Sequence, residues 1–139
     1  MSHYVKCKTK IKDEAVLVTA LGKLGVPKEA IDVAEPGKRL DYKGYGSQAG
    51  TANVVVRKDK FHKGYGDVAF CKGEDGFYSC TVDDMDDVGS LAKMVEVASF
   101  SSSVSQWYSA LKARKALMKQ GLSAKISRDG GKLVVLAKG

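Results

Sequence analysis

Three short segments rich in β-branched and aromatic side chains follow one another in the middle of the chain, and they constrain the fold most. Residues 51–57 have the continuous apolar pattern of a buried strand. Residues 67–72 and 76–82 are predicted to form a hairpin that turns through residues 73–76. Strands joined by short turns pair antiparallel. The sequence therefore predicts an antiparallel meander at the centre of the fold.

The beginning of the chain alternates between two kinds of side chain. One set is His3, Val5, Cys7, Thr9 and Ile11, and the other is Tyr4, Lys6, Lys8 and Lys10. Because successive side chains of a strand point to opposite faces, this pattern predicts a strand with one packed face and one lysine-lined face. The strand is expected to begin at residue 2, which leaves no room for a targeting peptide.

Helices are predicted on either side of the meander. Asp13 is a suitable N-cap and Gly25 a suitable residue after the last turn of a first helix. Its apolar face would consist of Leu17, Ala20, Leu21 and Leu24. A second helical region is expected from about Val88 to Ala98, and a longer helix from the serines at 101–103 to about Gln120. The longer helix would pack through Trp107, Ala110, Leu111, Leu117 and Met118.

The remaining segments complete the predicted topology. Residues 26–50 are punctuated by proline and glycine and are expected to be irregular. Residues 122–138 contain Asp129-Gly130, a strong hairpin signal, between two apolar-patterned runs. Because strands and helices are largely segregated, we expect one α+β domain over residues 1–139, with a largely antiparallel sheet and helices packed on one face.

Composition limits the class of protein. We expect no membrane association, because no apolar run approaches the roughly 18 residues that a membrane span needs. The three cysteines lack CxxC spacing and are expected to be free thiols. These features predict an intracellular protein, in the cytoplasm, in a plastid or associated with a virus, and not a secreted one.

Charge is distributed unevenly along the chain. The formal net charge is +7, yet residues 74–87 contain six acidic residues and no Lys or Arg. The rest of the chain therefore has 23 basic and 10 acidic residues. Such a surface favours an anionic macromolecule as a partner, although a basic protein is also simply kept soluble by its charge.

Several short segments resemble one known family. These segments are residues 1–4, 8–13, 42–45, 51–55, 64–70 and 119–122. Together they are similar to the hypothetical chloroplast open reading frame thirty-five family, a domain of unknown function in plastids, cyanobacteria and other bacteria. The chain departs from that pattern between the first helix and Tyr42, and in its serine-rich residues 99–105. The resemblance implies a fold and a whole-domain boundary, and it transfers no catalytic residue.

A duplicated tetrapeptide is the best candidate for a binding site. Lys-Gly-Tyr-Gly occurs at residues 43–46 and again at 63–66. Glycine allows close backbone approach, lysine supplies charge, and tyrosine offers a ring on which a base can stack. The predicted nucleic-acid-binding residues are Lys6, Lys8, Lys10, Tyr42, Lys43, Tyr45, Arg57, Lys63 and Tyr65. Alternatively, the glycines only shape turns and the tyrosines cover the sheet edge.

A second candidate surface would recognise protein. It consists of Tyr108 and four acidic residues, Asp83, Asp84, Asp86 and Asp87. Tyr108 is expected to be the exposed aromatic residue of the long helix, whereas Trp107 is expected in the core. The acidic run lacks the residue order of a calcium loop, so no metal is expected. Acidic residues at the start of a helix are also explained by the helix dipole.

No combination of residues indicates catalysis. His3 and His62 are the only histidines, and neither has recognised spacing to a cysteine. We therefore expect a non-enzymatic module without a cofactor. It would bind nucleic acid or another anionic macromolecule, or alternatively dock on a larger protein assembly as an accessory or structural subunit.

Overall fold

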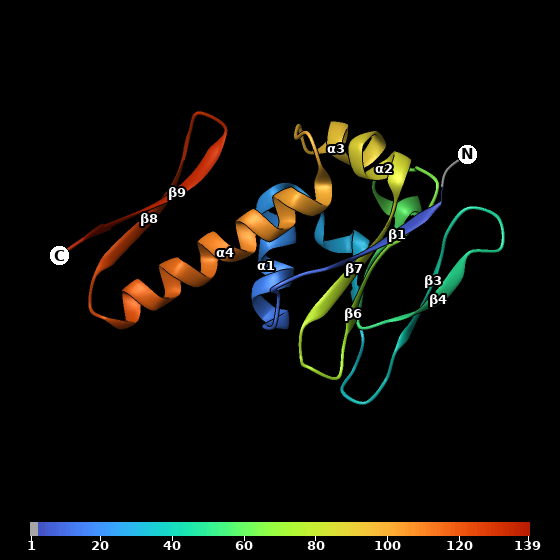
Figure 1. The fold of residues 1–139 in the computed structure, drawn as a ribbon, viewed down its shortest axis with the longest axis horizontal. Coiled ribbons are helices and arrows are strands. Elements are labelled where there is room, and N and C mark those ends of the chain that lie inside the picture. The colour runs from blue at the N-terminus through green and yellow to red at the C-terminus, as the bar shows by residue number, and fades with distance from the viewer. Residues whose placement is uncertain (1–2) are drawn as a thin grey trace.

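The computed structural model describes residues 3–139 and has an α+β architecture (Figure 1). Its main sheet is antiparallel and has the strand order β1-β7-β6-β5-β2. These strands are β1 (Tyr4–Lys8), β7 (Tyr78–Asp83), β6 (Val68–Lys72), β5 (Val54–Val56) and β2 (Ile31–Val33). The predicted meander is confirmed as β5, β6 and β7, and the α+β class is confirmed with it.

Helices cover one face of this sheet. They are α1 (Glu14–Leu24), α2 (Asp84–Val88), α3 (Ser90–Met94) and the long α4 (Phe100–Lys119), with short 3-10 turns at Lys28–Ala30 and Lys58–Lys60. The main core forms where α1 and α4 meet the sheet, around the fully buried Leu21, Phe70, Phe100 and Val104. As predicted, α1 begins at an N-cap Asp13 that accepts a hydrogen bond from the Val16 amide.

The other face of the sheet is covered by a small hairpin. This hairpin pairs β3 (Leu40–Lys43) with β4 (Ala49–Ala52) and encloses a second cluster around Val55 and Ala69. The sequence indicated only irregular structure here, because these strands are short and each is rich in polar or small residues. Their pairing depends on the sheet beneath them, not on local propensity.

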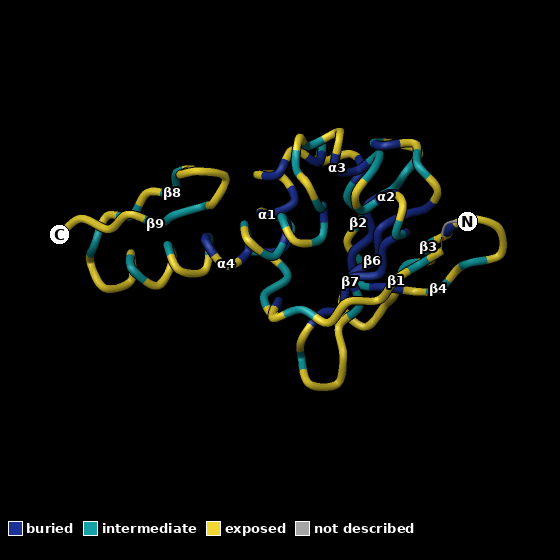
Figure 2. The backbone as a smooth tube through the Cα atoms, turned by 45° about the horizontal axis from the view of Figure 1, so that its top comes forward, coloured by how far each residue is buried: buried dark blue, intermediate teal, exposed yellow. Residues whose placement is uncertain are grey.

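The final hairpin lies away from the sheet. Its strands are β8 (Ser123–Asp129) and β9 (Lys132–Lys138), and it packs against the outer half of α4 (Figure 1). Most of this region is exposed or half-buried, whereas the buried residues concentrate in the main sheet and the helices on it (Figure 2). The predicted hairpin is confirmed. We call α4, β8 and β9 together the C-terminal arm.

Two predictions about the helices are wrong. The helical region expected from about Val88 to Ala98 instead begins at Asp84 and ends at Met94. It consists of two short helices separated by Gly89, which has the non-helical angles φ −114° and ψ −107°. On α4, Tyr108 is buried and not exposed as expected, whereas Trp107 is half-buried and packs against the main core. Tyr108 lies in line with Phe100 and Val104, and its hydroxyl accepts hydrogen bonds from the Lys12 and Asp13 amides at 3.0 and 2.9 Å.

The predicted packed face of the first strand is also largely wrong. Val5 is 38% exposed and Cys7 is exposed, so only Ile11, beyond the end of β1, is fully packed. The reason is that β1 is an edge strand and the helical layer does not cover these positions. Residues 1 and 2, with which the predicted strand began, lie outside the described residues.

Candidate functional site

The two Lys-Gly-Tyr-Gly motifs lie side by side, although they are 20 residues apart in the chain. The rings of Tyr45 and Tyr65 meet edge to face with centroids 5.6 Å apart. Both rings remain accessible, at 53% and 44% exposure. Lys43 and Lys63 are exposed in the same motifs. The structure therefore brings together four of the predicted binding residues, and we call them the motif pair.

Tyr4 explains why the motifs contain glycine. Its ring lies against Gly44 and Gly66, and its hydroxyl donates to the Asp67 carbonyl at 2.8 Å. A Cβ on Gly66 would come within 2.8 Å of the Gly44 Cα. A side chain at this position would therefore force the two motif backbones apart. Burial, together with the charge of Asp67, raises the pKa of Tyr4. The motifs are thus held together through Tyr4, which the sequence placed only on a lysine-lined face.

Two buried carboxylates hold the backbone of the motif pair. Asp86 accepts hydrogen bonds from the Tyr65 and Gly66 amides at 3.0 and 3.1 Å, and from the Ser90 hydroxyl at 3.0 Å. Asp67 accepts from the Lys43 and Lys58 amides, both at 3.0 Å. Their side chains therefore hold one residue of each motif directly, Lys43 in the first and Tyr65 in the second.

This arrangement corrects the predicted acidic docking surface. Asp83 and Asp86 are each only 1% exposed, and Asp83 caps α2 by accepting from the Met85 and Asp86 amides. Asp87 accepts from the Ser101 amide at 2.7 Å at the start of α4. Asp84 and Asp87 are half-buried, and Asp84 accepts from the His3 amide at 3.1 Å. The carboxylates turn inward because nearby backbone amides need acceptors.

Arg57 was predicted to face a nucleic acid, but it is engaged inside the protein. Its Nε donates to Asp32 at 2.7 Å, and its Nη1 donates to the Asp41 carbonyl at 2.7 Å and to Asp67 at 3.3 Å. Arg57 lines a cavity of about 400 Å³ with Tyr42 and Lys43. These bonds use the Nε and Nη1 donors of Arg57 and connect Asp32, Asp41 and Asp67 beside the motif pair.

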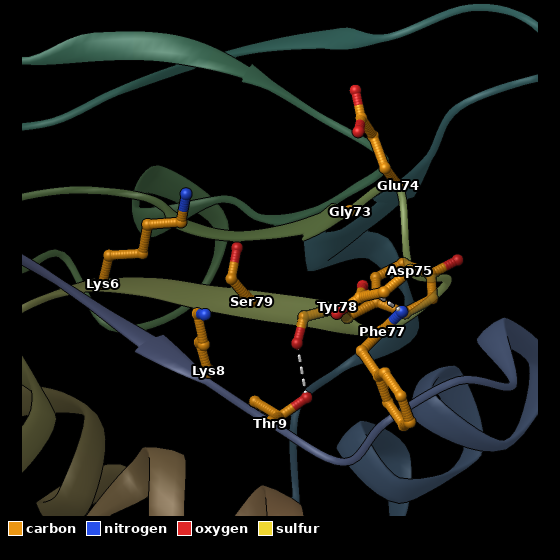
Figure 3. Close-up of a pocket in the computed structure, with 9 residues that line it drawn as sticks. All are labelled: Lys6, Lys8, Thr9, Gly73, Glu74, Asp75, Phe77, Tyr78 and Ser79. Atoms are coloured by element: carbon orange, nitrogen blue, oxygen red, sulfur yellow. Dashed lines mark hydrogen bonds between the residues drawn. The ribbon is translucent and has the colours of Figure 1, made fainter.

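Lys6 and Lys8 occupy a different place on the sheet. They line a cavity of about 420 Å³ that ends at Glu74 and Asp75 in the β6–β7 turn (Figure 3). Both signs of charge therefore meet in one cavity. Lys10 follows β1, is exposed and does not line this cavity. Tyr42 is half-buried, and its ring packs edge to face on the ring of Tyr4 with centroids 5.6 Å apart. The predicted binding residues consequently do not all line one site.

His62 adds a titratable group beside the motif pair. Its Nδ1 accepts from the Gly64 amide at 3.1 Å, so the neutral ring carries its proton on Nε2, which has no hydrogen-bond partner among residues 3–139. Burial lowers the pKa of His62 below its ordinary value of 6.5, and the positive charge of Lys58 also lowers it. The negative charges of Asp86 and Asp67 act in the opposite direction. A second proton, on Nδ1, would displace the Gly64 hydrogen bond.

We therefore expect acid to destabilise the fold through His62. Below about pH 6.5 the unfolded chain binds a proton at this ring that the folded chain does not, so the free energy of unfolding falls, by at most about 1.4 kcal/mol per pH unit. His62→Asn keeps an acceptor for Gly64 and removes the titration. Urea denaturation between about pH 7 and 5.5 should give a shallower pH dependence for the variant. Equal slopes for both proteins would contradict this assignment.

Neither a protein-family model, nor a curated protein, nor a solved structure matches this chain. The resemblance to the chloroplast open reading frame family therefore stays a prediction. Within residues 3–139, no three His, Cys, Asp or Glu side chains are grouped so that they could hold a metal ion. The helices described here are all too short or too polar to cross a membrane.

Proposed function

We propose that this chain is a small non-enzymatic module that binds single-stranded nucleic acid at the motif pair. The observation that carries the proposal is the contact between the exposed rings of Tyr45 and Tyr65, each flanked by a lysine from the same motif. Every nucleobase has a π-face, so such rings accept bases with little sequence preference. A lysine beside each ring can contact the adjoining phosphates.

Preorganisation supports this function. Because Asp67 and Asp86 hold the motif backbones from inside, the tyrosines are positioned before a ligand arrives. A surface that is ordered in advance loses less conformational entropy on binding. Lys43 and Lys63 would neutralise about two phosphates, which predicts a modest slope of about −1.4 for log K against log salt on a single strand.

Removing either ring should weaken binding of a short single-stranded RNA. We expect Tyr45→Ala or Tyr65→Ala to raise the dissociation constant about tenfold or more, because stacking contributes about 1–3 kcal/mol per base. Fluorescence anisotropy with a labelled oligonucleotide at two salt concentrations measures the effect. A duplex of the same sequence should bind more weakly, since its base faces are already stacked.

Phe77→Ala is the matched control. Phe77 is an aromatic residue of similar exposure, 37%, in the β6–β7 turn outside the motif pair. Its removal should leave the affinity unchanged. If wild-type protein does not bind at low salt, or if the tyrosine variants bind as well as the Phe77 variant, this function is excluded.

A second function is favoured by an apolar surface on the short helices. Met85, Val88 and Met94 are 51%, 64% and 53% exposed on α2 and α3. This surface supports docking on a larger protein assembly as an accessory subunit, in place of the acidic surface expected from the sequence. Association of that kind would be specific for one protein and nearly insensitive to salt, which distinguishes it from nucleic-acid binding.

A further inference from the structure

The formal charge of this protein is concentrated in its C-terminal arm. Residues 100–139 contain 8 of the 23 Lys and Arg residues but only one of the 16 acidic residues, Asp129. Residues 1–99 contain 15 basic and 15 acidic residues, so the whole net charge of +7 belongs to α4, β8 and β9 and their connections. Lys112 and Lys115 lie 3.7 and 3.9 Å from Asp13, which offsets part of this charge at the root of the arm. The electrostatic field of the molecule therefore attracts anions to the arm.

A small cavity lies where the hairpin meets the helices. Its volume is about 210 Å³, and it is lined by Lys23 of α1, Trp107 and Arg114 of α4, and Ala124, Lys125 and Ile126 of β8. Trp107 and Arg114 are seven residues apart, so they leave the same side of α4. Long side chains of a helix lean toward its N-terminus, which directs Arg114 back toward Trp107.

Two polar atoms of these lining residues are buried without a partner. They are Nε1 of Trp107 and Nε of Arg114, and neither has a hydrogen-bond acceptor among residues 3–139. Both are N–H donors that cannot accept. Buried donors are almost always satisfied in folded proteins, by protein groups or by ordered water, so these two N–H groups at the wall of one cavity call for an acceptor that the described residues do not supply.

The charge of the lining residues determines what kind of ligand fits. All four polar side chains that line the cavity are donors, and three of them are cationic: Lys23, Arg114 and Lys125, beside Trp107. None of the six lining residues is acidic. Water has donors of its own, which would find no side-chain acceptor here. A phosphate group offers several acceptor oxygens and up to two negative charges, and Arg and Lys recognise it strongly.

We propose that this cavity binds a phosphate group. Arg114 and the Trp107 indole hold it from α4, and Lys23 and Lys125 neutralise it from α1 and β8. The group is either free inorganic phosphate or the terminal phosphate of a nucleic-acid strand. This site does not depend on the Tyr45–Tyr65 pair, so the two proposals fail separately.

Trp107 makes the proposal directly measurable because it is the only tryptophan. The indole N–H of the ¹⁵N-labelled full chain gives a single NMR resonance, which is followed while inorganic phosphate is added. Sodium chloride at matched ionic strength is the reference. We expect a saturable shift with phosphate and none with chloride.

Two variants test the assignment of residues. Arg114→Gln and Lys125→Gln should each weaken phosphate binding by about tenfold or more, because a charge-assisted hydrogen bond is lost. Lys125 is exposed, so its variant tests the site even if replacement of Arg114 impairs folding. Lys119→Gln is the control, since Lys119 is an exposed lysine of the same helix outside this cavity.

A second titration identifies the source of the phosphate. It compares a short oligonucleotide carrying a 5′-phosphate with the same strand ending in a 5′-hydroxyl. A shift with inorganic phosphate supports a site for the free ion, and a shift only with the 5′-phosphorylated strand supports a strand-end site. If phosphate behaves like chloride and neither strand shifts the indole, the proposal is overturned and the cavity holds water. Binding that survives in both the Arg114 and Lys125 variants overturns it as well.

Discussion

Replacement of Asp86 by alanine is expected to lower the free energy of unfolding by about 3–5 kcal/mol, because three neutral donors lose their acceptor and each buried donor left unsatisfied costs about 1–3 kcal/mol. The Asp86 carboxylate is 1% exposed and accepts from two motif amides and the Ser90 hydroxyl. Alanine leaves these donors buried without an acceptor. Urea denaturation measures the loss. Release of the Tyr65 segment should also reduce affinity for single-stranded RNA in the anisotropy assay.

Asp84→Ala is the control for this substitution. Asp84 is two residues away and carries the same charge, but 36% of its side chain is exposed, and it accepts from the amide of His3 near the start of the chain. We expect its removal to leave the unfolding transition unchanged. If the Asp84 and Asp86 variants are equally stable, the inward orientation of Asp86 does not hold the motif pair.

Replacement of Asp67 by alanine should destabilise the protein by a similar amount, about 3 kcal/mol. Asp67 is 7% exposed, accepts from the Lys43 and Lys58 amides, and pairs with Arg57. Removing the Asp67 carboxylate leaves the Lys43 and Lys58 amides without an acceptor and gives the Arg57 guanidinium one acceptor fewer. Asp67→Asn should cost less, because its amide oxygen can still accept from one of the two backbone groups.

Asp32→Ala tests the other side of the same guanidinium. The Asp32 side chain is 40% exposed and its pair with Arg57 is partly solvated. We expect a loss of at most about 1 kcal/mol, as for other exposed ion pairs. Urea midpoints of the variants compare the two partners of Arg57 directly. A larger effect for Asp32 than for Asp67 would show that Arg57 depends mainly on its exposed partner.

Local sequence signals account well for the regular elements. The central strands, helix α1 with its Asp13 cap, and the Asp-Gly hairpin were all predicted, because each depends on neighbouring residues and on turn chemistry. Strands β3 and β4 were missed because short polar strands form only against an existing sheet.

The candidate sites show a different division. Duplication of Lys-Gly-Tyr-Gly is visible in the sequence, but the motifs meet through Tyr4 and Asp86 from two other segments and through Asp67, which directly follows the second motif. The acidic run was expected at the surface because charge normally remains in water. It turns inward because the backbone of the motifs needs acceptors, and this requirement arises only once those segments have met.

The sequence by itself determined the class of fold, the Asp13 cap of α1 and the position of the net charge, since these follow from local spacing and from counting residues. Only the tertiary structure decided which face of β1 and α4 is buried, and which tyrosines remain exposed. It also decided that Trp107, Arg114, Lys23 and Lys125 line one cavity. The physical reason is that burial and hydrogen-bond satisfaction depend on partners distant in the chain, and no local pattern specifies where those partners will lie.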